Sequence, residues 1–177
     1  RSAVEQAVQH LRFLGHERIG MVLGAVDHVP SARKLAAFQE LGGDAELVER
    51  GMFSMEGGQA AGSRVLRRGA TAVICASDVM ALGVVRGARR DGRDVPGEVS
   101  VVGFDDSLFM SCTDPPLTTV RQPIEAMGRG AVATLMSQIG GAPVSTEELL
   151  FAPELVVRGS TGPIAAVASL RSAAARD

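Results

Sequence analysis

The stretch Thr71–Asp106, TAVICASDVMALGVVRGARRDGRDVPGEVSVVGFDD, predicts a strand, a helix and a second strand. The runs 72–76 and 99–104 are continuously apolar and rich in β-branched residues, which is typical of buried strands. Between them, Ser77 or Asp78 can accept hydrogen bonds from the first free N–H groups of a helix. Two apolar strands joined by a helix indicate a right-handed βαβ unit in a sheet that is covered on both faces.

Two further features of this unit point to partners. The helix is apolar nearly all round in its first two turns, and one sheet can cover only one stripe of it, so we expect a second surface to cover the rest. The polar residues Ser77, Asp78, Asp105 and Asp106 all follow the carboxyl end of a strand. Because open α/β sheets hold ligands at that edge, the sequence predicts a ligand site there.

The same stretch resembles the effector-binding core of the lac-repressor-like family of bacterial transcription regulators. Family members typically read TA, an apolar run, ND-x-MALG, and then VP-x-(D/E)-(V/I)-SVVGFDD. The resemblance continues as CTDPPLTTVRQP (Cys112–Pro123) and PELVVRGST (Pro153–Thr161), and upstream as HLRFLGHERIGMVLG (His10–Gly24) and SARKLAAF (Ser31–Phe38). It covers nearly all of residues 1–161, in order and at family spacing.

The amino-acid composition excludes several classes of protein. A chain of 177 residues with 46% hydrophobic and 21% charged residues is typical of a globular domain. The net charge of −2, with scattered arginines, argues against a nucleic-acid surface within these residues. Cys75, Cys112 and the three histidines show no disulfide or metal spacing, which favours reduced thiols and no metal site. No transmembrane run or signal peptide is visible, and reduced thiols suit a cytoplasmic protein, which is what we expect. We expect no cofactor, because no cofactor fingerprint is present.

The remaining sequence predicts helices and strands in alternation. Ser2 and Glu5 form a capping box for an opening helix, and Ser31 is expected to cap the next one. We expect the other strands at 19–23, 47–49, 117–121, 149–151 and 154–157, and the other helices at 31–41, 55–68 and 124–139. No strand precedes the opening helix, so we expect the fold to begin upstream of Arg1.

The resemblance implies an α/β fold of the periplasmic-binding-protein-like type I class, a parallel-sheet sandwich with one lobe plus part of a second. Residues 1–121 and 152–161 would form the carboxyl-side effector-binding and dimerisation lobe. Residues 122–151 would belong to the amino-side lobe, and 162–177 would be a flexible tail. A DNA-binding helix-turn-helix would lie upstream and is absent here. We expect the apolar stripe of the 124–139 helix to be poorly covered by this chain.

The resemblance also implies ligand-binding residues. Arg33 would fork onto effector hydroxyls or carboxylates, although a solvated arginine is the plainer alternative. Asp105 would accept hydrogen bonds from a hydroxyl pair, or it would cap a neighbouring helix. Phe53 would pack on the effector ring, or it would be an ordinary core residue.

Two more positions complete the expected ligand set. Asp78 matches the family ND pair, in which Ser77 replaces the more frequent Asn, but Asp78 could equally be only a helix cap. Gln122 would contact the ligand or only the hinge. We expect Arg33, Phe53, Asp78 and Asp105 to converge on one cleft at the carboxyl edge of the sheet.

A two-fold homodimer is implied in the same way, through Val79–Arg86 and the loop Leu108–Pro115. Leu82 is expected near the two-fold axis. The expected interface residues are Val79, Leu82, Val85, Arg86, Cys112 and Thr113.

Three functions compete. The favoured one is the effector-sensing fragment of a DNA-binding transcriptional regulator, in which a sugar-like ligand in the interlobe cleft controls operator affinity. A periplasmic sugar-binding protein of a transporter would share the fold, and an upstream signal peptide would indicate it. An α/β enzyme could use Asp105 and Asp106 as acid and base or as Mg²⁺ ligands. No nucleophile elbow, P-loop or cofactor fingerprint accompanies them, and neighbouring strand residues face opposite ways, so we expect no enzyme.

Overall fold

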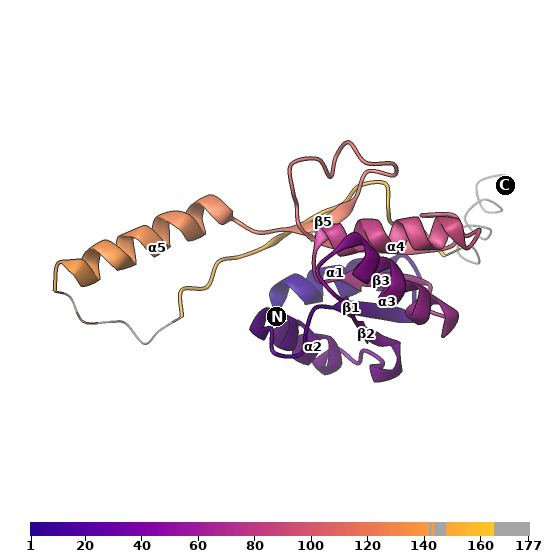
Figure 1. Ribbon diagram of the computed structural model, residues 1–177, viewed down its shortest axis with the longest axis horizontal. Coiled ribbons are helices and arrows are strands. Elements are labelled where there is room, and N and C mark those ends of the chain that lie inside the picture. The colour runs from indigo at the N-terminus through magenta and orange to yellow at the C-terminus, as the bar shows by residue number, and fades with distance from the viewer. Residues whose placement is uncertain (142, 144–147, 165–177) are drawn as a thin grey trace.

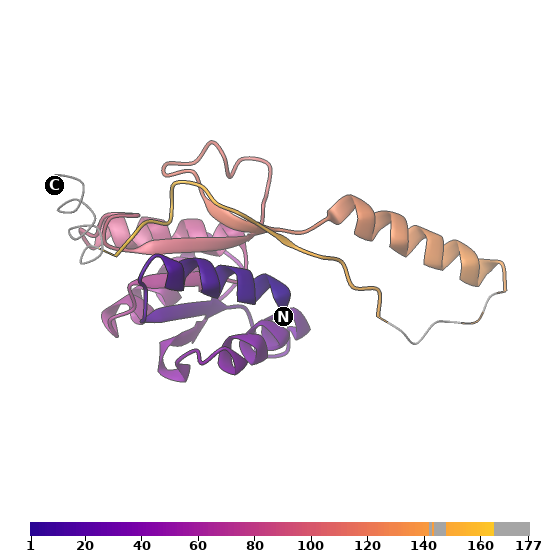
Figure 2. The same ribbon diagram turned by 180° about the vertical axis from the view of Figure 1, so that it is seen from behind.

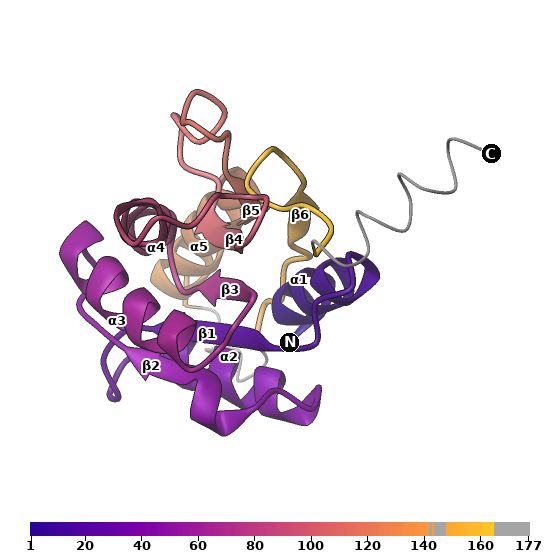
Figure 3. The same cartoon turned by 90° about the vertical axis from the view of Figure 1, so that its right-hand side faces the viewer.

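The computed structural model describes residues 1–141, 143 and 148–164, so most of the predicted tail lies outside the described residues. Within them one six-stranded sheet runs in the order β2-β1-β3-β4-β5-β6 (Figure 3). The strands are β1 (Ile19–Leu23), β2 (Val48–Arg50), β3 (Ala72–Cys75), β4 (Ser100–Asp105), β5 (Thr118–Arg121) and β6 (Glu154–Val156). Strands β1 to β5 pair in parallel, whereas β6 is antiparallel to β5. The predicted α/β class and parallel sheet are confirmed.

Helices cover both faces of this sheet. They are α1 (Ser2–Phe13), α2 (Val29–Glu40), α3 (Met55–Arg67), α4 (Asp78–Arg90) and α5 (Ile124–Ile139), with a short 3-10 turn, η1 (Ala45–Leu47), before β2. Helices α1 and α2 contact each other on one face, and α3 and α4 lie side by side on the other (Figure 3). Every residue of β1 and β3 is buried, as expected for continuous apolar strands between two helical layers.

The central βαβ unit forms as the sequence predicts, with one difference in what covers its helix. Ser77 caps α4 by accepting a hydrogen bond from the Met80 amide (3.4 Å). The apolar surface of α4 that the sheet leaves open is largely covered by α3 of the same chain. The two helices approach so closely that a Cβ at Gly58 would collide with the backbone of Met80, and one at Gly83 with the Met55 carbonyl. Small residues at the crossing therefore give α4 its second surface.

Two predicted helix starts are wrong. The capping box at Ser2 and Glu5 is not formed, because α1 already includes Ser2 and Arg1 occupies the cap position without a side-chain hydrogen bond. Helix α2 begins two residues before Ser31. His28 is its cap, and the ring of His28 accepts a hydrogen bond from the Ser31 amide (3.3 Å). A proline in the first turn suits this earlier start, since its missing N–H would have had no helical partner.

The part of the chain after β5 departs furthest from a packed fold. Helix α5 has the predicted bounds, but none of its described residues is buried, and it projects away from the sheet (Figures 1 and 2). The strand predicted at 149–151 is absent: these residues are irregular, and Leu149 and Leu150 are exposed. The expectation that α5 would be poorly covered is confirmed. No helix among the described residues has the length and apolar character needed to span a membrane.

Candidate functional site

The carboxyl edge of the sheet gathers the polar residues that the sequence singled out. Strand β3 leads into Ser77 and Asp78, β4 ends at Asp105, and β5 is followed by Gln122. Because β1 to β5 are parallel, these positions share one edge, and the crossover from β1 brings the first turn of α2 to the same edge.

Asp105 lies at the centre of this edge. One of its carboxylate oxygens accepts a hydrogen bond from Gln122 Nε2 at 2.6 Å. Burial raises the pKa of the Asp105 carboxyl and the nearby Asp78 carboxylate adds to this, whereas the bond from Gln122 and the charge of Lys34 partly offset the rise. The backbone of Asp105 has a φ of 114°, a conformation that residues other than glycine rarely adopt. Such strain is common at binding sites.

The structure adds a cation that the sequence analysis did not select. The Lys34 ammonium lies 3.8 Å from the centroid of the Phe104 ring, next to Asp105. Burial lowers the pKa of Lys34, and the carboxylate of Asp105 counteracts part of that effect. One feature of the sequence could have drawn attention to Lys34, because it is the single lysine among 18 basic residues. It directly follows Arg33 on the helix, so the two side chains point about 100° apart.

Arg33 itself points away from this group. Its guanidinium pairs with Glu148 at 2.5 Å, and 63% of its side chain is exposed. Arg33 still borders a cleft of about 680 Å³ between the start of α2 and the beginning of α5, together with Phe104 and Gln122. The cleft is lined by Arg1, Ser2, Ala3, Glu5, Val29, Pro30, Arg33, Phe104, Gln122, Pro123, Met127, Leu149, Leu150, Phe151 and Pro153.

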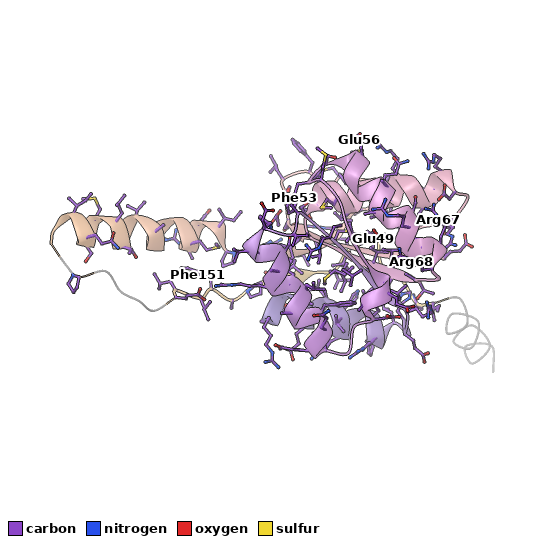
Figure 4. All side chains as sticks on the ribbon, turned by 60° about the horizontal axis from the view of Figure 1, so that its bottom comes forward. Glu49, Phe53, Glu56, Arg67, Arg68 and Phe151 are labelled. Carbon is purple, nitrogen blue, oxygen red and sulfur yellow. The ribbon has the colours of Figure 1, made fainter. Side chains whose placement is uncertain are left out.

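Phe53 lies at the side of the packed core that faces α5, apart from Phe151 on the segment that returns from α5 (Figure 4). It is 43% exposed and lines a second hollow of about 580 Å³ with Val26 and Met52. Its ring stands edge-on to the ring of His28, with centroids 4.8 Å apart. Phe53 therefore contacts His28, the cap of α2, and does not line the larger cleft.

Ser77 and Asp78 are buried and have partners inside the protein. The Asp78 carboxylate accepts hydrogen bonds from the Thr119 hydroxyl (2.5 Å) and the Ser107 amide (2.7 Å), so it ties β5 and the turn after β4 to the start of α4. Neither Ser77, Asp78 nor Asp105 lines the cleft. The expected convergence of Arg33, Phe53, Asp78 and Asp105 on one cleft is therefore wrong, because only Arg33 of the four borders it. Asp106 also faces away from Asp105 and binds arginines instead. The two neighbouring carboxylates therefore have different partners within the protein.

The expected dimer residues form a mixed surface. Val79 is 40% exposed, Leu82 is partly buried and Val85 is buried within the chain. Arg86 pairs with Glu56 of α3 (3.2 Å). In the loop after Asp106, Cys112 is exposed, and Thr113 donates within the loop, to the carbonyls of Met110 and Pro115. Leu108 and Phe109, which lie within the expected interface loop, are its two most exposed apolar residues.

Metal-ligating residues do not gather in the parts of the chain that the structure describes. His16 is buried and serves the fold. Its Nδ1 is 3.0 Å from the Thr71 hydroxyl, and its Nε2 contacts the Ser100 hydroxyl (2.9 Å) and the Gly162 carbonyl (3.0 Å). These bonds tie the α1–β1 turn to β4 and to the last described segment.

Comparisons with known proteins agree with this architecture. A family model described as a periplasmic binding protein-like domain matches residues 8–161. The HTH-type transcriptional regulator MalR of Streptomyces coelicolor is 54% identical over 171 residues, which cover 91% of this chain and 50% of that protein. The HTH-type transcriptional repressor CytR of Escherichia coli K12 is 38% identical over 168 residues, covering 90% and 49%. The chain spans about half the length of the curated relatives it matches.

Solved structures of regulators are similar as well. The dimeric Lac repressor matches with a TM-score of 0.82 and 31% identity over 92% of this chain and 61% of that one. A complex of the transcriptional regulator CelR with cellobiose matches with a TM-score of 0.78 and 35% identity, covering 90% and 50%. The chain therefore belongs to the family of periplasmic binding protein-like domains, and its relatives are LacI-family transcriptional regulators.

Proposed function

We propose that this chain is the effector-sensing, carboxyl-side part of a transcriptional regulator, in which a sugar-like ligand binds at the carboxyl edge of the sheet and controls operator affinity. The observation that carries the proposal is the grouping of Asp105, Gln122 and Lys34 beside the Phe104 ring, next to an open cleft. The relatives are named as transcriptional regulators, and one solved neighbour holds cellobiose.

The chemistry of this group favours a neutral polyhydroxy ligand. Lys34 and Asp105 carry opposite charges at neighbouring positions, so together they add no net charge to the site. A sugar hydroxyl can donate to the Asp105 carboxylate while it accepts from the Lys34 ammonium or the Gln122 amide. The neighbouring cleft is lined by apolar side chains such as Met127 and Phe151, against which a sugar face can pack. Charge-assisted hydrogen bonds to a carboxylate would supply much of the affinity.

The proposed mechanism couples the ligand to the arrangement of two lobes. Residues 1–121 and 152–161 form the carboxyl-side lobe, and the segment that contains α5 contributes to an amino-side lobe. A ligand that bridges the lobes favours the closed arrangement by its difference in affinity for the two arrangements. A DNA-binding domain outside this chain responds to closure through a cytoplasmic homodimer. We propose no catalytic role, cofactor or membrane partner.

Calorimetry of the protein encoded by the whole reading frame tests this proposal, with a panel of cellobiose, other sugars, nucleosides and small acids. Asp105→Asn removes a charge-assisted acceptor, so we expect a loss of about 1.5–3 kcal/mol, roughly ten- to a hundredfold in affinity. Asp114→Asn is the control, because 92% of that side chain is exposed and its arginine partner is 3.4 Å away. Wild-type affinity in the Asp105 variant would overturn the proposed site.

A pair of neighbouring substitutions shows which cation binds the ligand. Lys34→Met keeps a long apolar side chain but removes the ammonium that lies over Phe104, so we expect roughly tenfold weaker binding. Arg33→Lys cannot reproduce the guanidinium fork and should also weaken binding if the Arg33–Glu148 pair opens to admit the ligand. Calorimetry with the same ligand measures both. If neither change alters the affinity, the start of α2 is not part of the site.

We also propose a two-fold dimer through α4 and the loop after β4, which expose Val79, Leu108 and Phe109. Leu82→Asp would place a charge opposite its own copy at a cost on the order of several kcal/mol, and the dimer should dissociate. Phe13→Asp, an equally large change at an exposed position of α1, serves as control. Sedimentation velocity measures both variants, and an intact Leu82→Asp dimer would place the interface elsewhere.

A further inference from the structure

Two crossover segments connect α5 to the sheet. The outgoing crossover, Gln122–Pro123, leaves β5, and the return crossover, Phe151–Pro153, enters β6 (Figures 1 and 2). The strands meet where the crossovers begin and end, because Arg121 is the ladder partner of Glu154. Whatever fixes this meeting point also sets the direction in which α5 leaves the sheet.

The Asp106 carboxylate lies at this meeting point and is only 8% exposed. One oxygen accepts from Nε of Arg121 at 2.7 Å, and the other pairs with Nη2 of Arg158, also at 2.7 Å. Arg158 in turn donates from Nη1 to the Leu117 carbonyl (2.8 Å) at the start of β5. We call Asp106, Arg121 and Arg158 the crossover clamp, because one carboxylate holds the outgoing strand and the segment that follows β6.

The turn at the end of β4 gives the two consecutive acids different targets. Asp105 and Asp106 both have positive φ angles, 114° and 56°. With this backbone, Asp105 reaches Gln122 and Asp106 reaches Arg121, so two neighbouring carboxylates hold two neighbouring residues of the crossover. The position of Gln122 in the candidate site thus depends on both acids.

The return crossover has a second anchor on α1. The Gln6 side chain donates from Nε2 to the Pro153 carbonyl (3.1 Å) and accepts from the Leu155 amide (2.9 Å). A single amide side chain therefore satisfies one backbone carbonyl just before the edge strand β6 and one backbone amide within it. Both crossovers are held on the sheet side by side chains rather than by core packing.

We propose that Asp106 is a positioning residue of the effector response, which fixes both crossovers to the sheet and keeps Gln122 beside Asp105. Burial alone would raise the pKa of the Asp106 carboxyl, but the bonds from Arg121 and Arg158 outweigh it and lower the pKa, so the clamp is charged at neutral pH. Its role in signalling rests on the proposed function, whereas the clamp itself can be tested without any effector.

Hydrogen exchange of the full-length protein, followed by mass spectrometry without ligand, is the test. Asp106→Asn removes the charge but tolerates the left-handed backbone, since asparagine adopts positive φ more readily than most residues. We expect amides of Thr118–Arg121 and Glu154–Val156 to exchange on the order of tenfold faster, while those of β1 and β3 keep their rates. Asp106→Glu keeps the carboxylate and should fall between the variant and the wild type.

Two further variants sharpen the outcome. Gln6→Leu removes both bonds to the return crossover, so exchange should accelerate at Leu155 and leave β5 unchanged. Asp114→Asn, an exposed acid, should change nothing. Wild-type exchange of the crossover strands in Asp106→Asn would overturn the proposal, and so would equal acceleration of β1 and β3, which would show a loss of overall stability only. Either failure would leave the calorimetric test of the effector site untouched.

Discussion

Helices α4 and α5 have similar lengths, 13 and 16 residues, yet they differ in how far their side chains are buried. Most residues of α4 are buried between the sheet and α3, whereas no described residue of α5 is buried. Helix α4 was predicted from its capping residues between two apolar strands, and α5 from the spacing of its apolar residues. Neither signal shows which surface covers the helix. In α4 the cover lies in the same chain. In α5 the apolar stripe, which includes Leu135 and Ile139, stays exposed and does not pack into a core of described residues.

The sharpest test of this contrast replaces one methionine in each helix by alanine. Met80 in α4 is fully buried, so Met80→Ala should destabilise the fold by about 2–5 kcal/mol. Met136 in α5 is 60% exposed, and Met136→Ala should change the free energy of unfolding by less than about 0.5 kcal/mol. Urea denaturation of this chain measures both. A large cost for Met136→Ala that arises only in a longer protein or at high concentration would show that another surface covers α5.

A pair of glycines extends the comparison to the backbone. In Gly83→Ala the new methyl group would collide with the Met55 carbonyl of α3, and forcing the helices apart should cost about 1–3 kcal/mol in urea denaturation. In Gly128→Ala the new methyl group meets nothing within 4 Å, so helix propensity alone decides and α5 should gain about 0.5–1 kcal/mol. Circular dichroism at 222 nm reports the gain. Equal tolerance at both glycines would contradict the close α3–α4 crossing.

The smallest expected effect is the pH dependence of the free energy of unfolding, which arises from His10 in α1 and His16 in the α1–β1 turn. Burial lowers the pKa of His16 below its ordinary value of 6.5, with the Gly162 carbonyl opposing part of the shift, and burial also lowers the pKa of His10. As the pH falls, the unfolded chain therefore binds protons before the folded chain does. The stability linked to the neutral form of these histidines is fully present above about pH 6.5 and is lost as the pH falls below it. Urea midpoints between pH 5 and 8 should show the loss in the wild type and less of it in His16→Gln.

The candidate site shows where local inference ends. Asp105 and Gln122 were selected from the sequence and lie in contact. Arg33 was selected and Lys34 was not, because a motif places residues along the chain but does not show which of two neighbours on a helix turns inward. The buried bonds of Asp78 to Thr119 and Ser107 involve residues 41 and 29 positions away, and no local pattern encodes them.

What the sequence alone determined are features that depend on neighbours within a few residues. These are the bounds of β1 and α5, the start of α4 at Ser77 or Asp78 and the parallel α/β class, since apolar periodicity and helix capping act over one or two turns. The tertiary structure alone decided which surfaces meet. The cover of α4 by α3, the place of Lys34 over Phe104 and the clamp at Asp106 all join segments distant in the chain. Packing and charge pairing act through space, so only the folded chain specifies them.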